Sequence, residues 1–221
     1  MSSNHTSIGP DISAYLDEKF SSEDEFLSNL RLRAKEEQIP EIQIAPAQGL
    51  ILQFLLKSIN AANVLEVGTL AGYSAITMAR ALPINGNLLT IESEFKHAIF
   101  AETMIKEAEL DSVIQIQNSD AREFLKEYKP EKLFDFVFVD ADKPSYKYYL
   151  DIITPMLRVG GIFVADNAFA FGFLTSYKPE RNPNEIKSIQ GFNIYFRNHP
   201  QYFTSIIPIG DGMIAGVKIE N

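Results

Sequence analysis

From residue 46 onward, short apolar runs alternate with longer stretches that have the apolar spacing of a helix. Runs rich in Val, Ile and Phe indicate strands, and strands that alternate with helices indicate βα units and a parallel sheet. The apolar residues of each run are continuous, which indicates strands buried on both faces. The expected strands are 63–67, 88–91, 113–116, 134–139 and 161–165, and the expected helices are 47–59, 73–82, 95–110, 121–128 and 145–157.

The tail of the chain has a different pattern. The strand-like runs 202–207 and 213–219 are separated only by the segment 208–212, which leaves no room for a helix. A hairpin follows, so the parallel sheet is expected to end in an antiparallel pair. Before the hairpin, the segment 168–183 mixes aromatic residues with Pro and Gly and is too long for a simple connector.

The first 45 residues are more acidic than the rest of the chain, with nine acidic against four basic residues. Their apolar residues have helical spacing, interrupted at Ser21 and Ser22, which predicts a helical preamble that docks on the main domain or on a partner subunit. An ordinary solvated helix face explains the pattern equally well. The length and even composition favour one domain over 1–221, with the preamble at 1–45 and an α/β core at 46–221.

Charge and cysteine content exclude several functions. The formal net charge is -9, which argues against a nucleic-acid-binding surface. The chain has no cysteine, so it cannot form a disulfide, a thiolate nucleophile or a zinc–cysteine site. The polar N-terminus lacks the regions of a signal peptide, and no apolar run approaches the length of a membrane span. We expect a cytoplasmic protein with neither a nucleic acid nor a membrane as partner.

The residues after the first two expected strands could hold a nucleoside ligand. Gly68 and Gly72 would let the backbone turn tightly into a helix, either for packing or to approach a ligand. The G-x-G-x-x-G pattern of dinucleotide sites is missing, and the acidic Glu66 before the turn suits a cationic ligand better than a phosphate. Glu92 follows the second strand, where an acid commonly accepts hydrogen bonds from ribose hydroxyls.

Polar residues also follow the later strands. Asp140 comes after the fourth strand, and Asp166 with Asn167 after the fifth. Neighbouring parallel strands would bring these three side chains to one edge of the sheet, where two carboxylates and an amide oxygen suit Mg²⁺. Three unrelated helix caps are the alternative explanation. Asp120 is better explained as a helix cap than as a ligand-binding residue.

Four segments carry a resemblance to a known family: LEVGTLAGYSAITMARALP, FDFVFVDADKPSYKYY, RVGGIFVADN and PIGDGM. The chain resembles the cation-dependent O-methyltransferases, which include caffeoyl-CoA O-methyltransferase and, more distantly, catechol O-methyltransferase. The resemblance runs from about residue 10 to the end. It implies a doubly wound, seven-stranded, Rossmann-like class I methyltransferase sheet, preceded by N-terminal helices, and a homodimer.

The resemblance also implies roles for individual residues. Asp140, Asp166 and Asn167 match metal ligands for Mg²⁺, or for another divalent cation such as Mn²⁺ or Ca²⁺. Lys143 has the position of a proposed general base, although a surface lysine is the alternative. The residues that match contacts to S-adenosylmethionine are Glu66, Gly68, Thr69, Ser74, Glu92, Ala121, Asp140, Asp142 and Tyr149.

The expected reaction is methyl transfer from S-adenosylmethionine to a hydroxyl of a catechol-like aromatic, a small phenolic substrate. A bound Mg²⁺ acidifies a coordinated phenol, two adjacent hydroxyls would chelate it, and Lys143 could take the proton if its pKa is depressed. The alternatives are a different hydroxylated acceptor, a nucleotide-dependent oxidoreductase, or a non-catalytic nucleotide-binding protein.

The sequence departs from the plant members of that family in two places. Ala170-Phe171 stands where those members have Trp-Asn, so caffeoyl-CoA specificity is unsupported, and Ile44 replaces a threonine that contacts the cofactor. In the phenylalanine-rich segment 168–174, Phe169, Phe171 and Phe173 would supply an apolar wall for an aromatic ring. Packing against the preamble or a second subunit explains them equally well.

Overall fold

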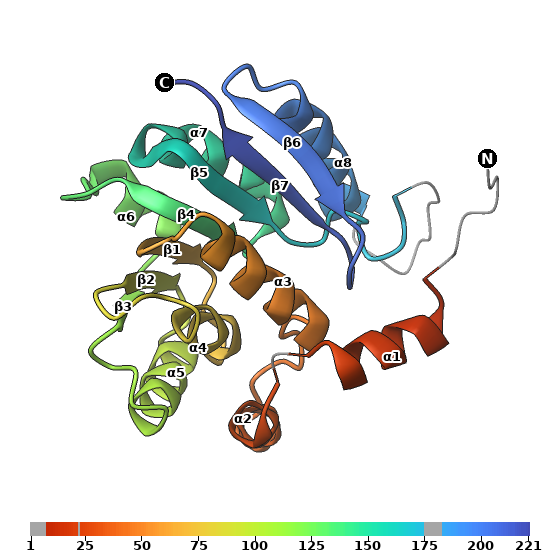
Figure 1. The fold of residues 1–221 in the computed structure, drawn as a ribbon, viewed down its shortest axis with the longest axis vertical. Coiled ribbons are helices and arrows are strands. Elements are labelled where there is room, and N and C mark those ends of the chain that lie inside the picture. Colours follow the sequence, from red (N-terminus) through yellow and green to blue (C-terminus); the bar gives the residue numbers. More distant parts are fainter. Residues whose placement is uncertain (1–7, 22, 175–182) are drawn as a thin grey trace.

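A mixed seven-stranded sheet forms the centre of the computed structural model, which describes residues 8–21, 23–174 and 183–221 (Figure 1). The strand order is β3-β2-β1-β4-β5-β7-β6, in which β1 to β5 are parallel and β7 is antiparallel to both β5 and β6. This confirms the predicted doubly wound sheet with its C-terminal hairpin. The strands are β1 Asn63–Val67, β2 Asn87–Glu92, β3 Ile114–Asn118, β4 Phe134–Val139, β5 Leu157–Ala165, β6 Tyr202–Ile207 and β7 Met213–Lys218.

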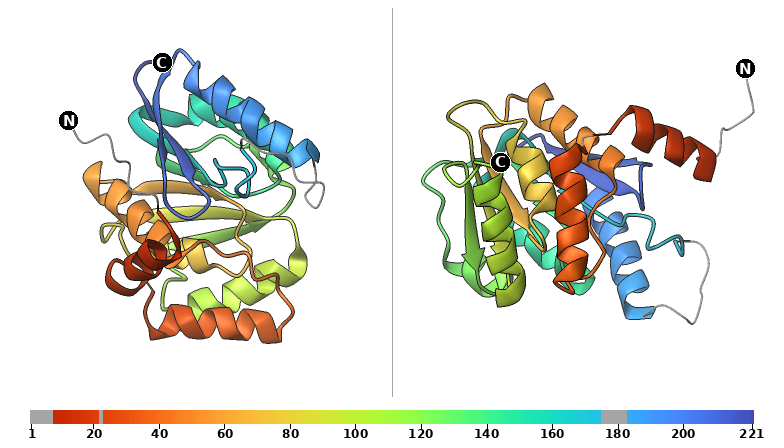
Figure 2. Two further views of the ribbon diagram at one scale, coloured as in Figure 1. Left: turned by 90° about the vertical axis from the view of Figure 1, so that its right-hand side faces the viewer. Right: turned by 90° about the horizontal axis from the view of Figure 1, so that it is seen from below.

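Helices cover both faces of the sheet (Figures 1 and 2). One face packs against side chains of α2 to α5, and the other against side chains of α6 to α8. The α-helices are α1 Pro10–Lys19, α2 Glu25–Glu36, α3 Pro46–Ser58, α4 Tyr73–Ala79, α5 Phe95–Glu107, α6 Ala121–Glu127, α7 Tyr146–Ile153 and α8 Pro183–Arg197, and two short 3₁₀ helices are η1 Lys143–Ser145 and η2 Thr154–Met156.

Strand β4 explains why the apolar runs are continuous. Phe136 and Phe138 belong to the core on one face of the sheet, whereas Val137 and Val139 belong to the core on the other. All four side chains are fully buried. A central parallel strand is covered on both sides, so consecutive positions along it favour apolar residues.

The largest differences from the predicted elements lie around β5 and α8. Strand β5 begins at Leu157, four residues before the predicted start. The prediction missed these residues because Arg158 and Gly160 interrupt the apolar run, and the register of β5 against β4 also shifts there. The predicted helix 145–157 ends as α7 at Ile153, followed by a 3₁₀ turn that contains Pro155. Helix α8 was not predicted, and 175–182 of the expected loop 168–183 lie outside the described residues.

The N-terminal helices differ in how they meet the core. Helix α2 buries Leu27, Leu30 and Ala34 in the same apolar core as α3, α4 and α5. Helix α1 buries none of its residues and projects from the rest of the molecule (Figure 2). The second part of the preamble therefore docks on the α/β core, as one of the two sequence interpretations expected. Among the described residues, no helix is both long and apolar enough to cross a bilayer.

Candidate active site

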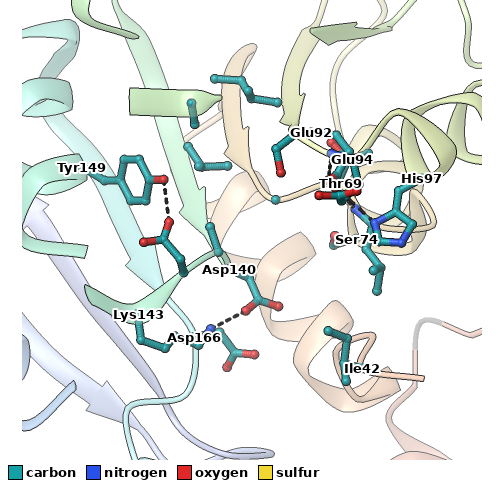
Figure 3. A pocket seen from close by; sticks show the side chains of 18 of the residues that line it. Ile42, Thr69, Ser74, Glu92, Glu94, His97, Asp140, Lys143, Tyr149 and Asp166 are labelled. Atoms are coloured by element: carbon teal, nitrogen blue, oxygen red, sulfur yellow. Dashed lines mark hydrogen bonds and ion pairs between the residues drawn. The ribbon is translucent and has the colours of Figure 1, made fainter. Parts of the chain in front are cut away.

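A cavity of about 570 Å³ opens at the carboxyl ends of the parallel strands (Figure 3). It lies between β1 and β4, where the direction of the strand order reverses: β1 to β3 follow one another toward one edge of the sheet, and β4 and β5 toward the other. Open α/β sheets bind their ligands at this position. The predicted site residues that line the cavity are Gly68, Thr69, Ser74, Glu92, Ala121, Asp140, Asp142, Lys143, Tyr149, Asp166 and Asn167.

The turn after β1 requires glycine for two separate reasons. Gly68 has a φ of +100°, and a Cβ there would lie 2.1 Å from the carbonyl oxygen of Asp140 at the end of β4. Gly72 has a φ of +84° and is the N-cap of α4, but a Cβ there would only touch Ala101 at 3.3 Å. Backbone packing between two strand ends therefore explains Gly68, and the same close approach places the turn at the cavity wall.

Glu66 lies beneath this turn and not on the cavity surface. Its side chain is fully buried and accepts a hydrogen bond from Thr90 Oγ1 at 2.6 Å, and that hydroxyl lies 2.6 Å from Thr69 Oγ1. Burial raises the pKa of the Glu66 carboxyl to about 8, because the charged form loses its water. A contact between Glu66 and a cofactor remains a prediction.

Glu92 is held rigidly at the cavity edge. One carboxylate oxygen accepts the backbone N–H of Leu70 at 2.8 Å, the other accepts that of Glu94 at 2.9 Å, and His97 Nδ1 lies 3.7 Å away. The acid therefore joins the end of β2 to the glycine turn (Figure 3). Each carboxylate oxygen retains capacity for a further hydrogen bond, as a ribose hydroxyl would require.

A second set of polar contacts lies at the ends of β3 and β4. Tyr149 from α7 donates to Asp142 Oδ1 at 2.9 Å, and Ser145 donates to Asp142 Oδ2. Asp120 accepts the N–H of Arg122 at 2.8 Å as the N-cap of α6, which confirms that Asp120 caps a helix. Ala121, the first residue of that helix, lines the cavity beside it.

Asp140 and Asp166 lie close together on the side of the cavity away from Glu92 (Figure 3), and Asn167, the next residue along the chain, also lines the cavity. Asp166 is 5% exposed and accepts Gln48 Nε2 at 2.8 Å, whereas Asn167 Nδ2 donates to Asp211 Oδ2 at 3.2 Å. Burial, followed by the charge of Asp140, raises the pKa of Asp166 to about 7.

The donor set fits a hard divalent cation. The carboxylates of Asp140 and Asp166 lie close enough to repel one another, and there is too little positive charge nearby to offset both. The amide nitrogen of Asn167 already donates to Asp211, which leaves the amide oxygen of Asn167 as the possible ligand atom. Oxygen ligands of this kind suit Mg²⁺, Mn²⁺ or Ca²⁺. Within the described residues, no group of three or more His, Cys, Asp or Glu side chains is placed to hold a metal ion.

Lys143 is an interior residue, so the surface-lysine alternative is wrong. Its side chain is 11% exposed, and Nζ lies 2.8 Å from Asp140 Oδ1 and 2.7 Å from the hydroxyl of Tyr146. Burial alone would lower the pKa of Lys143, but its interactions with Tyr146 and with the Asp140 carboxylate outweigh burial and hold that pKa above the usual value. From the sequence, Lys143 could act as a base only if its pKa were depressed; in this arrangement Lys143 keeps its proton.

Only one of the three predicted aromatic wall residues, Phe171, lines the cavity among the described residues. Its backbone N–H donates to Asp211 Oδ2 at 2.8 Å, and its φ is +61°, so that carboxylate supports an unusual backbone conformation. The ring of Phe169 lies where a Cβ on Gly212 would meet it at 2.9 Å. Phe173 packs on the small core of Ala170, Ile186 and Ile189.

Three side chains near Asp140, Asp166 and Asn167 were not predicted from the sequence. Gln48 from α3 and Asp211 from the hairpin loop hydrogen-bond to Asp166 and Asn167, and Tyr146 holds Lys143. Asp211 lies in PIGDGM, a segment that carried the resemblance, so that motif was a usable signal. Tyr146 likewise lies in FDFVFVDADKPSYKYY, another such segment, whereas nothing in the sequence around Gln48 indicates which neighbour it meets.

The strand order and the cavity at the carboxyl ends of the parallel strands have the arrangement of a class I methyltransferase. The sequence model described as O-methyltransferase matches residues 17–219, so the chain belongs to that family. A relative named catechol O-methyltransferase, from Niastella koreensis, is 41% identical over 160 residues, covering 72% of each chain. A caffeoyl-CoA O-methyltransferase from Populus kitakamiensis is 33% identical over 175 residues, covering 75% of this chain and 74% of the relative.

Solved structures agree with this assignment. The O-methyltransferase TomG from Streptomyces achromogenes, solved in complex with S-adenosylmethionine, superimposes with a TM-score of 0.84 at 28% identity, covering 95% of this chain and 96% of that one. An O-methyltransferase from Bacillus cereus, solved with S-adenosylhomocysteine, has a TM-score of 0.84 at 27% identity, covering 94% and 97%.

Proposed function

We propose that the chain is a divalent-cation-dependent enzyme that methylates one hydroxyl of a catechol-like aromatic with S-adenosylmethionine. The observation that carries the proposal is the cluster of Asp140, Asp166 and Asn167 beside Lys143, at one side of a cavity whose other side suits a nucleoside. The relative named catechol O-methyltransferase supports the acceptor class.

The cofactor is assigned to the side of the cavity formed by the glycine turn and Glu92. S-adenosylmethionine supplies an activated methyl group on a positively charged sulfur. Glu92 is fixed by two backbone N–H groups, so it can accept ribose hydroxyls with little further ordering. Asp142 is likewise held by two hydrogen bonds, in this case from the hydroxyl groups of Tyr149 and Ser145. Ser74 and Ala121 complete this part of the wall.

The cation is assigned to Asp140, Asp166 and Asn167. When bound, a divalent cation lowers the pKa of a phenol and fixes the position of its oxygen. Gln48 and Asp211 hold two of these three side chains in place from elements outside the parallel strands. Such supporting contacts orient ligands before a metal arrives.

Lys143 is proposed to receive the proton of the acceptor hydroxyl. The ion pair with Asp140 keeps Nζ protonated, so Lys143 can act as a base only after that pair weakens and Nζ has released its own proton to solvent. Neutralisation of the Asp140 carboxylate would lower the pKa of Lys143, which links its role as a base to occupation of the cation site. Tyr146 keeps Nζ directed toward the cavity throughout.

Phe171 is proposed to contact the ring of the acceptor. It lines the cavity together with Asn167, Lys143 and Glu185. An apolar side chain beside a cluster of oxygen ligands suits a molecule with one flat apolar face and a pair of adjacent hydroxyls. The exposed Tyr15 of the projecting helix α1 and the exposed Phe20 directly after that helix, together with the family resemblance, support a homodimer.

The test is methyl transfer from labelled S-adenosylmethionine to a catechol, to the matching monohydric phenol, and to neither. We expect transfer to the catechol with Mg²⁺, none after chelation, and none with Asp140→Ala at any Mg²⁺ concentration. Asp151→Ala is the control, because Asp151 is exposed and pairs with Lys147 on the surface.

Transfer that survives chelation, or full activity in Asp140→Ala, would remove the cation from the proposal. Equal rates on the phenol and the catechol would remove the vicinal diol as the recognised feature. If S-adenosylhomocysteine binds by calorimetry but no catechol reacts, a different hydroxylated acceptor takes the place of the catechol.

A further inference from the structure

The connection between α2 and α3 forms one wall of the cavity. Ile42, Gln43 and Ile44 line it, and these residues belong to no helix or strand. Ile42 is 68% exposed at the rim, whereas Ile44 is 4% exposed (Figure 3). A wall without regular secondary structure keeps its shape only if side chains elsewhere hold its backbone.

Arg31 of α2 holds this wall. Its guanidinium donates to the carbonyl oxygen of Ile44 at 2.5 Å, and its Nε donates to Glu23 Oε2 at 2.6 Å. The planar guanidinium carries several donors in a fixed fork, so one side chain can serve two acceptors at once. The Arg31 side chain is 27% exposed and that of Glu23 is 22% exposed, so both charges are largely removed from water.

The same arginine also reaches a second element of the cavity wall, α4. Its Cζ lies 4.1 Å from the centre of the Tyr73 ring, and the Tyr73 hydroxyl donates to Glu23 Oε2 at 2.8 Å. Tyr73 is the first residue of α4, directly after Gly72, and it lines the cavity. Arg31, Glu23 and Tyr73 therefore join the α2–α3 connection to the glycine turn.

We propose that Arg31 is a positioning residue for the cofactor: it ties the wall at 42–44 to the glycine turn and so sets the width of the cofactor end of the cavity. No residue of α2 lines the cavity among those the structure describes, so Arg31 acts through Ile44 and Tyr73. Partly buried ion pairs contribute little net stability when apolar packing could replace them. The cluster is therefore better explained by the arrangement it imposes on two cavity walls than by stability alone.

The experiment measures the Kd of S-adenosylhomocysteine by calorimetry, together with Tm, for Arg31→Ala and for the matched control Arg33→Ala. Arg33 lies on the same helix and pairs with Glu107 on the surface, outside the cavity wall. We expect Kd to rise about tenfold in Arg31→Ala, because a charge-assisted hydrogen bond to the wall is lost, and to stay within about twofold in Arg33→Ala.

Arg31→Lys keeps the charge but cannot donate to Glu23 and to the Ile44 carbonyl at once, so we expect a Kd between those of the wild type and Arg31→Ala. A Tm restored to the wild-type value in Arg31→Lys, with a Kd that is not restored, would also support positioning. Cofactor binding of wild-type strength in Arg31→Ala would overturn the proposal, whatever happens to Tm. If Arg31→Ala does not fold, Tyr73→Phe removes only the hydroxyl bond to Glu23, and an unchanged Kd in that variant would likewise overturn it.

This inference rests on the assignment of the cofactor to the glycine-turn side of the cavity. Glu92→Ala is measured in parallel for that reason. A weaker Kd in Glu92→Ala with an unchanged Kd in Arg31→Ala overturns only the role of Arg31. Unchanged values in both variants overturn the cofactor assignment itself. Neither result depends on the acceptor or on a cation, because S-adenosylhomocysteine binding is measured without them.

Discussion

The turn after β1 needs glycine for close backbone packing at Gly68 and for a positive φ at both Gly68 and Gly72. Comparing Gly68→Ala with Gly72→Ala should separate these two effects. Gly68→Ala adds a Cβ 2.1 Å from the carbonyl oxygen of Asp140, where backbone has to move. Gly72→Ala adds a Cβ 3.3 Å from the Cβ of Ala101, a close contact with a side chain and not with backbone. Both positions have positive φ, so both variants carry a dihedral cost of about 1–2 kcal/mol.

The difference between the two variants measures the contact between strand ends. Overpacking of this kind costs about 1–3 kcal/mol, which gives Gly68→Ala a total of about 2–5 kcal/mol against about 1–2 kcal/mol for Gly72→Ala. In a chain of this size each kcal/mol lowers Tm by roughly 2–4 °C. Gly68→Ala should also weaken cofactor binding, since the displaced backbone carries Asp140 and borders the cavity.

The assay is thermal unfolding of both variants, followed by calorimetric titration with S-adenosylhomocysteine. The expected result is a larger loss of Tm in Gly68→Ala, accompanied by a larger increase in Kd. Equal losses of Tm and equal Kd values in the two variants would refute the reasoning, because they would show that the approach of Gly68 to Asp140 is not tight in solution.

Three further predictions follow from the polar contacts. Glu92→Ala should raise the Kd of S-adenosylhomocysteine about tenfold by removing an acidic acceptor at the cavity edge, and calorimetry that finds no change would place the ribose elsewhere. Asp211→Ala should raise the KM for the acceptor while the cofactor Kd stays unchanged, because the N–H of Phe171 and the amide of Asn167 lose their acceptor; steady-state kinetics would contradict this if only kcat changed. In Glu66→Gln, urea unfolding from pH 5 to pH 9 should show a smaller decline in stability with rising pH than in the wild type; the raised pKa of Asp166 gives both proteins a remaining decline. The folded wild type keeps a proton on Glu66 up to about pH 8, whereas the unfolded chain releases it near its ordinary pKa of 4.5. Parallel pH profiles for the two proteins would show that the pKa of Glu66 is not raised.

The central strands were predictable because helices cover both of their faces. Along β4, residues 136–139 alternate between the two cores, which leaves a continuous apolar run in the sequence. Strand β5 was predicted too short, since Arg158 and Gly160 interrupt the pattern where β5 begins. Helix α8 was missed because its apolar residues are dispersed among polar ones and follow a segment that reads as a loop.

The candidate site was predictable to the extent that it follows strand ends. Asp140 and Asp166 come directly after β4 and β5, so the parallel arrangement alone brings them to one edge. Gln48 could not be found in this way, because its contact with Asp166 joins residues 118 positions apart. The protonated state of Lys143 was also beyond the sequence, as it depends on the distances to Asp140 and Tyr146.

The antiparallel strand β7 has a consequence for how this protein folds. Because β7 runs opposite to β5, the loop before it reaches the carboxyl ends of the parallel strands, where Asp211 meets Asn167 and a Cβ on Gly210 would meet Gln48. The first strands and helices can form from local contacts, but this closure joins distant parts of the chain and is entropically slow. During refolding, far-UV circular dichroism should therefore recover before cofactor binding does.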